Sequence, residues 1–230
     1  MYINDLVIEV TRKCDMRCSH CLRGMAQNKD MDYSIIDKVL SEVRSIGGVT
    51  FTGGEPTLGI KAIKYFIKRA KELGTYIGYF YVVSNGKKQS ISLAKALIDL
   101  YSMCDEREMC CLCVSRDQFH DSGNDTPLYE ALSFYNKEER KGKIPFEALL
   151  NEGMAYLNGY GTREVKHDGF DIEEDDELRV DNLVYISSNG SVVDGCDFSY
   201  DRIDEESLGN IMHESLSNII LKTKGVAKDE

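Results

Sequence analysis

Apolar residues follow two alternating patterns along the first half of the chain. Short runs rich in β-branched and aromatic residues predict strands, whereas longer segments with apolar residues three and four positions apart predict amphipathic helices. In the segment 32–47 the apolar stripe ends at Gly47, a residue type that commonly follows the last turn of a helix. The predicted strands are 5–10, 49–54, 76–86 and 109–115, and the predicted helices are 32–47, 60–74 and 90–103.

This alternation predicts an α/β fold. Strands separated by helices form βαβ units, whose right-handed crossovers place successive strands parallel to one another in one sheet. The strand runs lack a strict apolar–polar alternation, which indicates a sheet covered on both faces or a barrel. In such folds the loops at the carboxyl-terminal ends of the strands build the functional site.

The second half of the chain is less regular. A helix is predicted for 127–142, whereas 144–157 fits a strand or a helix. The acidic run 171–177 is expected to form a solvated loop or linker. Beyond it, 182–196 predicts a β-hairpin that turns at Asn189-Gly190, and 208–222 predicts a turn followed by a helix.

Length and charge narrow the functional classes. A chain of 230 residues, 42% of them hydrophobic, accommodates one domain with a core, or one domain with a short extension. The net charge of −11 argues against nucleic acid or an anionic membrane surface as the main partner. No apolar run approaches the length of a membrane span, and the first residues lack the regions of a signal peptide. We therefore expect a cytoplasmic location, where cysteines stay reduced.

Three of the eight cysteines, Cys14, Cys18 and Cys21, lie in the stretch TRKCDMRCSHCLRG directly after the first predicted strand. Their spacing is compatible with a buried stripe on one helical face, although the intervening polar residues make a poor helix core. A structural zinc site usually takes four ligands, and no obvious second ligand pair accompanies these three. Three thiolates suit a four-iron cluster better, because they hold three irons and leave the fourth open for a ligand.

A Cys-x3-Cys-x2-Cys loop after the first strand of a βα-repeating chain resembles the radical S-adenosylmethionine (SAM) superfamily. The resemblance covers roughly residues 5 to 121 and implies a partial (β/α)6-type TIM barrel that is open on one side. It implies one 4Fe-4S cluster held by Cys14, Cys18 and Cys21, whose open iron chelates the amino and carboxylate groups of SAM. It also implies reductive cleavage of SAM to a 5′-deoxyadenosyl radical, which abstracts hydrogen from a substrate.

Three further motifs at the ends of later strands strengthen the resemblance. They are GGEP at 53–56, SNG at 84–86 and SRDQFH at 115–120. In the family, a GGE-type motif meets the SAM amino group, and the other two turns lie near its carboxylate or ribose. Each motif is also compatible with ordinary turn or capping chemistry. By resemblance, the SAM-binding residues are Gly53, Gly54, Glu55, Ser84, Asn85, Ser115 and Asp117.

Two histidines and a group of later cysteines complete the candidates. His20 occupies a position where the family commonly has an aromatic or apolar residue near the adenine, so the resemblance adds it to the SAM-binding set. For His120 an ordinary polar loop histidine is favoured, with substrate contact or proton transfer as the alternative. For the remaining cysteines, buried inert thiols are favoured over a second metal site. These cysteines are Cys104, Cys110, Cys111 and Cys113.

The C-terminal segment resembles the beginning of a SPASM or twitch extension, which is appended to radical SAM peptide-modifying enzymes. The resemblance consists of the Asn-Gly hairpin, Cys196 shortly after it, and the stretch Leu-Gly-Asn-Ile at 208–211. Because Cys196 is the last cysteine of the chain, the segment cannot by itself supply the ligands of an auxiliary cluster. We expect a radical SAM core over 1–180 and a degenerate extension over 181–230 that caps it.

The resemblance implies a radical SAM enzyme with oxidoreductase-type chemistry, a 4Fe-4S cluster and SAM as its cofactors. The sequence assigns no catalytic side chain and leaves the substrate open, with a peptide or protein among the candidates. The expected partners are SAM, the substrate, and an electron donor such as flavodoxin or ferredoxin. Two alternatives remain: an activase that installs a glycyl radical on a partner protein, and a non-catalytic regulatory protein that binds zinc or an iron–sulfur cluster.

Overall fold

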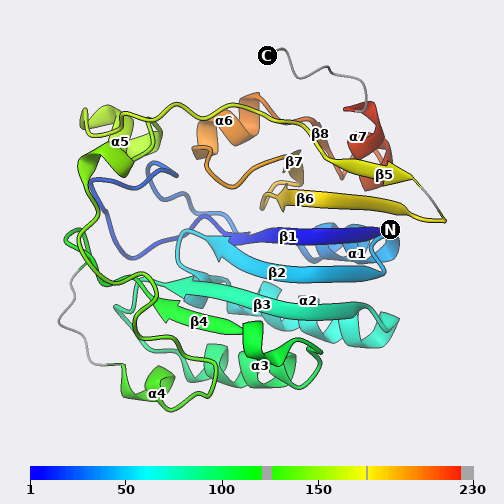
Figure 1. Cartoon of the computed structure of the whole chain (residues 1–230), viewed down its shortest axis with the longest axis horizontal. Helices are drawn as coiled ribbons and strands as arrows, with labels where there is room; N and C mark the ends of the chain where they lie inside the picture. Colours follow the sequence, from blue (N-terminus) through cyan, green and yellow to red (C-terminus); the bar gives the residue numbers. More distant parts are fainter. Residues whose placement is uncertain (121–125, 175, 224–230) are drawn as a thin grey trace.

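One mixed sheet of eight strands organises the computed structural model, which describes residues 1–120, 126–174 and 176–223 (Figure 1). The order β4-β3-β2-β1-β6 is parallel throughout, and β7 and β8 continue it in antiparallel fashion. The strands are β1 (Tyr2–Thr11), β2 (Ser45–Gly53), β3 (Tyr76–Ser84), β4 (Cys111–Val114), β5 (Ile172–Glu174), β6 (Leu178–Ile186), β7 (Ser191–Val193) and β8 (Gly209–Asn210).

Helices α1, α2 and α3 connect successive parallel strands and cover one face of the sheet (Figure 1). Helix α2 buries its apolar face, and Phe66 packs edge-on against Phe51 of β2 with ring centroids 5.3 Å apart. The α-helices are α1 (Tyr33–Glu42), α2 (Ile60–Leu73), α3 (Ile91–Tyr101), α4 (Pro127–Glu130), α5 (Gly153–Leu157), α6 (Tyr200–Glu205) and α7 (Leu216–Lys222). Short 3-10 helices are η1 (Pro56–Gly59), η2 (Arg107–Met109) and η3 (Phe146–Ala148).

Strand β6 pairs with β1 and not with β4. The chain leaves β4, crosses to the opposite edge of the sheet, and runs parallel to β1 with Leu6 opposite Val184 and Ile8 opposite Ile186. The sheet is therefore open, which confirms the predicted α/β class with a partial barrel. Strand β6 crosses position 180, where the sequence places the boundary between core and extension.

The predicted helix over 32–47 is wrong at its C-terminal end. Helix α1 ends at Glu42 and β2 begins at Ser45, four residues before the predicted strand. Ser45 to Gly48 pair in parallel with both β1 and β3, and this two-sided pairing outweighs the local helical pattern. A Cβ at Gly48 would lie 2.4 Å from the ring of Tyr79, so this glycine serves the packing of the sheet.

The predicted helix over 127–142 is reduced to the single turn α4. The following residues run beside β4 instead, where Leu112 N donates to Phe134 O and Asn136 N donates to Leu112 O, both at 2.9 Å. Strand β4 lies at the edge of the sheet, so its backbone groups need these partners. The ambiguous segment 144–157 forms η3 and α5.

The acidic run 171–177 contains a strand where a loop was predicted. Residues Ile172–Glu174 form β5, which pairs antiparallel with β6, and residue 175 lies outside the described residues.

The hairpin prediction is confirmed, because β6 and β7 pair antiparallel on either side of Asn189-Gly190. Helix α7 confirms the last predicted helix, and Glu42 of α1 accepts the Leu216 N–H at 2.8 Å.

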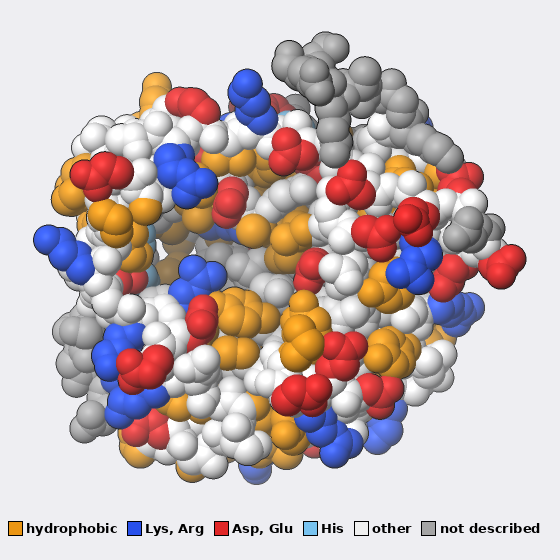
Figure 2. Space-filling view, viewed as in Figure 1, with side chains coloured by type: hydrophobic (Ala, Val, Ile, Leu, Met, Phe, Trp, Pro, Cys, Tyr) orange, Lys and Arg blue, Asp and Glu red, His pale blue; other side chains and the backbone are white. Residues whose placement is uncertain are grey.

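The parallel strands point their carboxyl-terminal ends toward the left edge of the sheet in Figure 1. The cysteine loop that follows β1 and the segment around α5 gather at this edge. Figure 2 shows that the surface is hollowed there, with basic side chains at the rim of the hollow. In the described parts of the chain, no helix combines the length and apolarity needed to cross a bilayer.

Candidate functional site

The three clustered cysteines lie in a loop that leaves β1 at Arg12 and returns beside it at Met31. Arg12 N donates to Lys29 O at 2.8 Å, and Met31 N donates to Val10 O at 3.1 Å. Between these points the chain forms single turns, such as Cys21 N donating to Cys18 O at 3.2 Å, and no helix. The alternative of a buried cysteine stripe on a helix is therefore excluded.

The thiols of this loop are half-buried and free. Burial raises the pKa of Cys18 to about 12, and the negative charges of Cys21 and Cys14 add to the rise. Burial also raises the pKa of Cys14, although its sulfur accepts a hydrogen bond from Met16 N at 3.4 Å. A positively charged metal centre would therefore be needed to hold these sulfurs as thiolates at neutral pH.

Among the described residues, the three sulfurs do not form a compact site for a single metal ion. Among the described residues, the group whose ligand atoms all lie within 4.8 Å of one another does not include Cys14, Cys18 and Cys21. Three sulfurs on one zinc ion at a Zn–S distance of about 2.3 Å would lie roughly 3.8 Å apart. In a four-iron cluster each cysteine binds a different iron, which sets the sulfurs farther apart.

The glycines of the GGEP motif allow the end of β2 to lie against the root of the cysteine loop. Gly54 N donates to Thr11 O and Glu55 N donates to Lys13 O, both at 2.8 Å. A Cβ at Gly53 would lie 1.9 Å from Thr11 O, and one at Gly54 would lie 2.2 Å from Lys13 O. Only glycine fits these two positions, because neighbouring backbone occupies the space of a side chain.

Glu55 is buried, with 2% of its surface exposed, and joins the ends of β2 and β3. Its carboxylate accepts hydrogen bonds from Ser84 Oγ at 2.9 Å, Asn85 N at 2.8 Å and Thr57 N at 3.1 Å. Burial raises the pKa of Glu55, and these hydrogen bonds oppose the rise. The side chains of Glu55 and Ser84 are thus hydrogen-bonded to each other. They hold the ends of β2 and β3 together and so support the site.

Asn85 brings the end of β3 to the cysteine loop. Its Nδ2 donates to Asp15 Oδ1 at 2.9 Å and lies 3.9 Å from Cys14 Sγ. A cavity of about 260 Å³ opens at this junction, and Lys87 at its wall donates to the Asp15 carbonyl. The cavity is lined by Asp15, Met16, Arg17, Cys18, Asn85, Lys87 and Phe119.

The end of β4 reaches the same place through Asp117 and His120. Ser115 N donates to Ser84 O at 3.0 Å, which aligns the two strand ends. Asp117 accepts a hydrogen bond from Phe119 N at 2.8 Å, and His120 Nδ1 lies 2.9 Å from both of its carboxylate oxygens. His120 Nε2 in turn lies 3.8 Å from Cys18 Sγ, so this histidine reaches the cysteine loop.

His20 packs beside these residues. Its ring stacks on Phe119 at 4.1 Å between centroids and meets the ring of His120 edge-on at 5.3 Å. Burial lowers the pKa of His20, and the charge of His120 contributes. Its Nδ1 is occluded and has no partner within the described residues. The ligand atoms of His20, Asp117 and His120 lie within 4.8 Å of one another, a donor set that metal ions accept.

The remaining five cysteines lie elsewhere. Cys104, Cys110 and Cys113 are buried thiols, and Cys113 Sγ lies 3.6 Å from the Tyr81 hydroxyl on the sheet. Cys196 Sγ lies 3.6 Å from its neighbour Asp197. Within the described residues no group of three or more cysteines has ligand atoms close enough for one metal ion.

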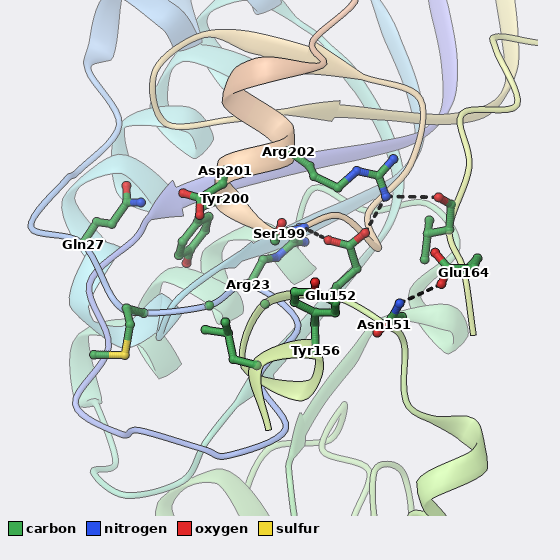
Figure 3. A pocket seen from close by; sticks show the side chains of 15 residues that line it. Arg23, Gln27, Asn151, Glu152, Tyr156, Glu164, Ser199, Tyr200, Asp201 and Arg202 are labelled. Carbon is green, nitrogen blue, oxygen red and sulfur yellow. Dashed lines mark hydrogen bonds and ion pairs between the residues drawn. The ribbon is translucent and has the colours of Figure 1, made fainter. Parts of the chain in front are cut away.

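A larger cavity, of about 640 Å³, adjoins the other half of the cysteine loop (Figure 3). Met154 N donates to Cys21 O at 2.8 Å and Tyr200 N donates to Arg23 O at 3.1 Å, so its walls contact the loop directly. The sequence did not indicate this cavity, because its walls come from segments more than a hundred residues apart. It is lined chiefly by 23–27 of the loop, 151–157 around α5, Glu164 and Val165, and 199–202 at the start of α6.

Comparison with known sequences points to one family. The family model described as Radical SAM superfamily matches residues 8–105. The chain is 35% identical over 71 residues to putative protein YfkA of Bacillus subtilis (strain 168). It is 29% identical over 65 residues to an uncharacterized protein of Methanocaldococcus jannaschii. These matches cover 29% and 27% of this chain but only 19% and 23% of the two relatives.

Two solved structures are similar in fold. The structure described as native anSMEcpe with bound AdoMet and Cp18Cys peptide has a TM-score of 0.57 and 16% identity, over 95% of this chain and 80% of that chain. Streptococcus suis SuiB bound to precursor peptide SuiA has a TM-score of 0.51 and 12% identity, over 95% of this chain and 64% of that chain. At these identities the likeness concerns the fold.

Proposed function

We propose, from the match of residues 8–105 to the Radical SAM superfamily model, that this chain is a radical SAM enzyme that cleaves SAM reductively and abstracts hydrogen from a substrate. One observation carries the proposal. The cysteine loop, GGEP, SNG and SRDQFH, which are dispersed over more than a hundred residues, meet at the carboxyl-terminal edge of one parallel sheet.

We propose that Cys14, Cys18 and Cys21 hold a single 4Fe-4S cluster. Their free thiols, their absence from the groups of described residues that could hold one metal ion, and the absence of a fourth cysteine in the loop support three iron ligands over one zinc site. When bound and reduced, the cluster with SAM supplies the electron and the 5′-deoxyadenosyl radical for hydrogen abstraction. The hydrogen bond from Met16 N and the amide of Asn85 would stabilise the Cys14 sulfur as a thiolate.

We propose that SAM binds in the 260 Å³ cavity beside Cys18. The cationic side chains of Arg17 and Lys87 and the amide of Asn85 suit the carboxylate and hydroxyl groups of SAM, and Phe119 offers a stacking surface for its adenine. Gly53 and Gly54 belong to the proposed set through the close approach of their backbone to the root of the cysteine loop. The proposed set also contains Glu55 and Ser84 as buried supports, and His20, Ser115 and Asp117 around Phe119.

We propose a peptide or protein segment as the substrate. The two structures of similar fold are described as bound to the Cp18Cys peptide and to the precursor peptide SuiA, respectively. In this chain the 640 Å³ cavity beside Cys21 has the size and the open rim that a peptide side chain requires. The electron donor is proposed to be a small redox protein such as flavodoxin or ferredoxin.

Replacing Cys18 by Ala tests the cluster assignment. We expect the reconstituted variant to lose most of its iron and sulfide and to form no 5′-deoxyadenosine, because one of the three iron ligands is gone. Its far-UV circular dichroism should stay native, because the Cys18 side chain is only half-buried. Iron and sulfide analysis and chromatography of the SAM products measure the two effects.

Cys196→Ala is the matched control, since it removes a half-buried thiol outside the cysteine loop. This variant should keep four irons and four sulfides per chain and cleave SAM at the wild-type rate. The assignment is wrong if Cys18→Ala keeps the cluster. Stable binding of one zinc ion by the wild type, with no SAM cleavage, would instead favour the regulatory alternative.

A further inference from the structure

Arg23 is a buried cation without an ion pair. Its side chain is 8% exposed, and its Nη1 donates to Phe198 O at 2.7 Å. Its guanidinium also lies over the ring of Tyr185, 4.8 Å from the centroid. No carboxylate of the described residues forms a salt bridge with it. Buried charges in proteins are usually paired, so an unpaired guanidinium next to a cavity requires an explanation.

The carboxylate whose charge acts most on Arg23 is Glu9, and it is already fully engaged. Glu9 Oε1 accepts from Arg12 Nε at 2.7 Å and from Ser188 N at 2.9 Å, and its Oε2 accepts from the Tyr185 hydroxyl at 2.6 Å. The other guanidinium nitrogens of Arg23 have no partner among the described residues and are not occluded. Arg23 is one of the residues that line the 640 Å³ cavity (Figure 3).

The other charged residues of the cavity wall are accounted for within the chain. Arg202 pairs with Glu152, and Glu164 accepts from Asn151 Nδ2 at 2.7 Å. Asp201 is exposed to solvent. An acidic wall of this kind disfavours a doubly charged phosphate, whereas a single guanidinium matches the planar geometry of one carboxylate.

The rim of the cavity is apolar. Met25, Tyr156 and Leu157 all line it and are exposed by 54%, 60% and 69%, respectively. Large apolar side chains gathered at the mouth of a polar cavity are typical of a site that takes an apolar group. The wall next to Arg23 contacts Cys21 through its backbone, so a molecule in this cavity lies beside the cysteine loop.

We propose that Arg23 binds a carboxylate of the substrate in this cavity, with an apolar group of the same molecule against Met25, Tyr156 and Leu157. The ligand class is thus a carboxylate next to an apolar side chain, as in an N-acylated amino acid or at the C-terminus of a peptide. That this ligand is the substrate rests on the proposed function.

The first test compares two pairs of probes by calorimetry. N-acetyl-L-leucine should bind at least about tenfold more tightly than N-acetyl-L-leucinamide, which has the same shape without the charge. An N-acetylated tetrapeptide ending in leucine and its C-terminal amide form the second pair. Tighter binding of the peptide acid than of N-acetyl-leucine identifies a peptide source, and equal binding identifies a small carboxylate. Equal binding of acid and amide in both pairs overturns the proposal.

The second test uses variants. Arg23→Gln should abolish the preference for the acid, whereas Lys64→Gln, an equal charge change at an exposed position of α2, should leave it intact. Should Arg23→Gln fail to fold, Arg23→Lys keeps the charge and should show a weaker preference, because lysine lacks the planar fork. A preference that survives in Arg23→Gln contradicts the proposal.

The remaining measurements separate this inference from other roles of Arg23. If SAM displaces N-acetyl-leucine, Arg23 serves SAM and the inference is wrong. If Arg23→Gln changes only the iron content and not the acid preference, the residue compensates the charge of the cluster instead. Binding is measured before and after cluster reconstitution. An acid preference in a protein that forms no cluster would refute the proposed function and leave the carboxylate site standing.

Discussion

Single residues decide how closely the strand ends approach one another at the site. Gly53 has a φ of +140°, and its missing side chain leaves room for the carbonyl oxygen of Thr11. By resemblance Gly53 and Gly54 belong to the SAM-binding set, and the structure adds that these glycines accommodate the chain itself. Gly74, at the end of α2, also has a positive φ of +66°, but no atom lies within 4 Å of the place of its Cβ.

Gly53→Ala should therefore destabilise the protein far more than Gly74→Ala. We expect a loss of at least about 3 kcal/mol at position 53, where a Cβ collides with backbone, and about 1 kcal/mol at position 74, where only the left-handed backbone is unfavourable. Urea unfolding monitored by circular dichroism measures both. Equal losses would mean that the end of β2 can shift away from the cysteine loop at little cost.

At the scale of elements, polar pairs attach irregular segments to the sheet. His167, in the segment before β5, bonds through Nδ1 to Asp194 at the end of β7, and its ring stacks on Phe198 at 4.3 Å. The hydrogen bond to Asp194 raises the pKa of His167 against the effect of burial. Burial would raise the pKa of Asp194, but the bonds from His167 and Gly169 N outweigh it and lower that pKa.

This pair predicts a pH-dependent stability. The contribution of His167 to the free energy of unfolding is complete below its unfolded pKa of about 6.5. This contribution is lost as the pH rises through the raised pKa of the folded protein. The contribution of Asp194 to the free energy of unfolding is complete above its unfolded pKa of about 3.9. This contribution is lost as the pH falls through the lowered pKa of the folded protein. The pair therefore stabilises the fold most between about pH 4 and 6.5.

His167→Gln checks this prediction. The wild type should exceed the variant in unfolding free energy by about 1 kcal/mol more at pH 6 than at pH 9. Glu206 lies 3.6 Å from His167 Nε2, so Glu206→Gln serves as a control that should change this pH dependence only slightly. A difference between wild type and His167→Gln that does not vary with pH would contradict the assigned cause.

At the scale of the whole molecule, one arginine joins the cysteine loop to the C-terminal segment. Arg12 is 1% exposed, bonds to Glu9 through Nε, and forms two bonds of 2.7 Å with Asp204 of α6. Its guanidinium also lies 4.6 Å from the ring centroid of Tyr200. Together with the pairing of β6 and β1, these contacts make the C-terminal segment part of the structure that holds the cysteine loop.

Asp204→Ala should destabilise the protein by about 2 kcal/mol, because it leaves the buried Arg12 with one carboxylate in place of two. Glu205→Ala, at the exposed neighbouring position of the same helix, should cost less than about 0.5 kcal/mol. Urea unfolding gives both values. If the two variants are equally stable, the C-terminal segment is not coupled to the loop through Arg12.

Local chemistry in the sequence was enough to determine several features of this protein. The apolar patterns predicted strands β1 to β4 and the helices between them, and the Asn189-Gly190 turn predicted the hairpin. The spacing of Cys14, Cys18 and Cys21, with motifs at three later strand ends, indicated one site at one edge of the sheet. These features depend on residues close together in the chain, whose periodicity and turn preferences are visible without a structure.

Only the tertiary structure decided the rest. It placed β6 beside β1, turned Ser45 to Gly48 into strand, and drew the segment after α4 along the edge of β4. It also set His120 against Cys18 and left Arg23 unpaired at a cavity wall. These outcomes depend on hydrogen bonds and buried charges between residues far apart in the sequence, and no local pattern encodes which distant partner will satisfy them.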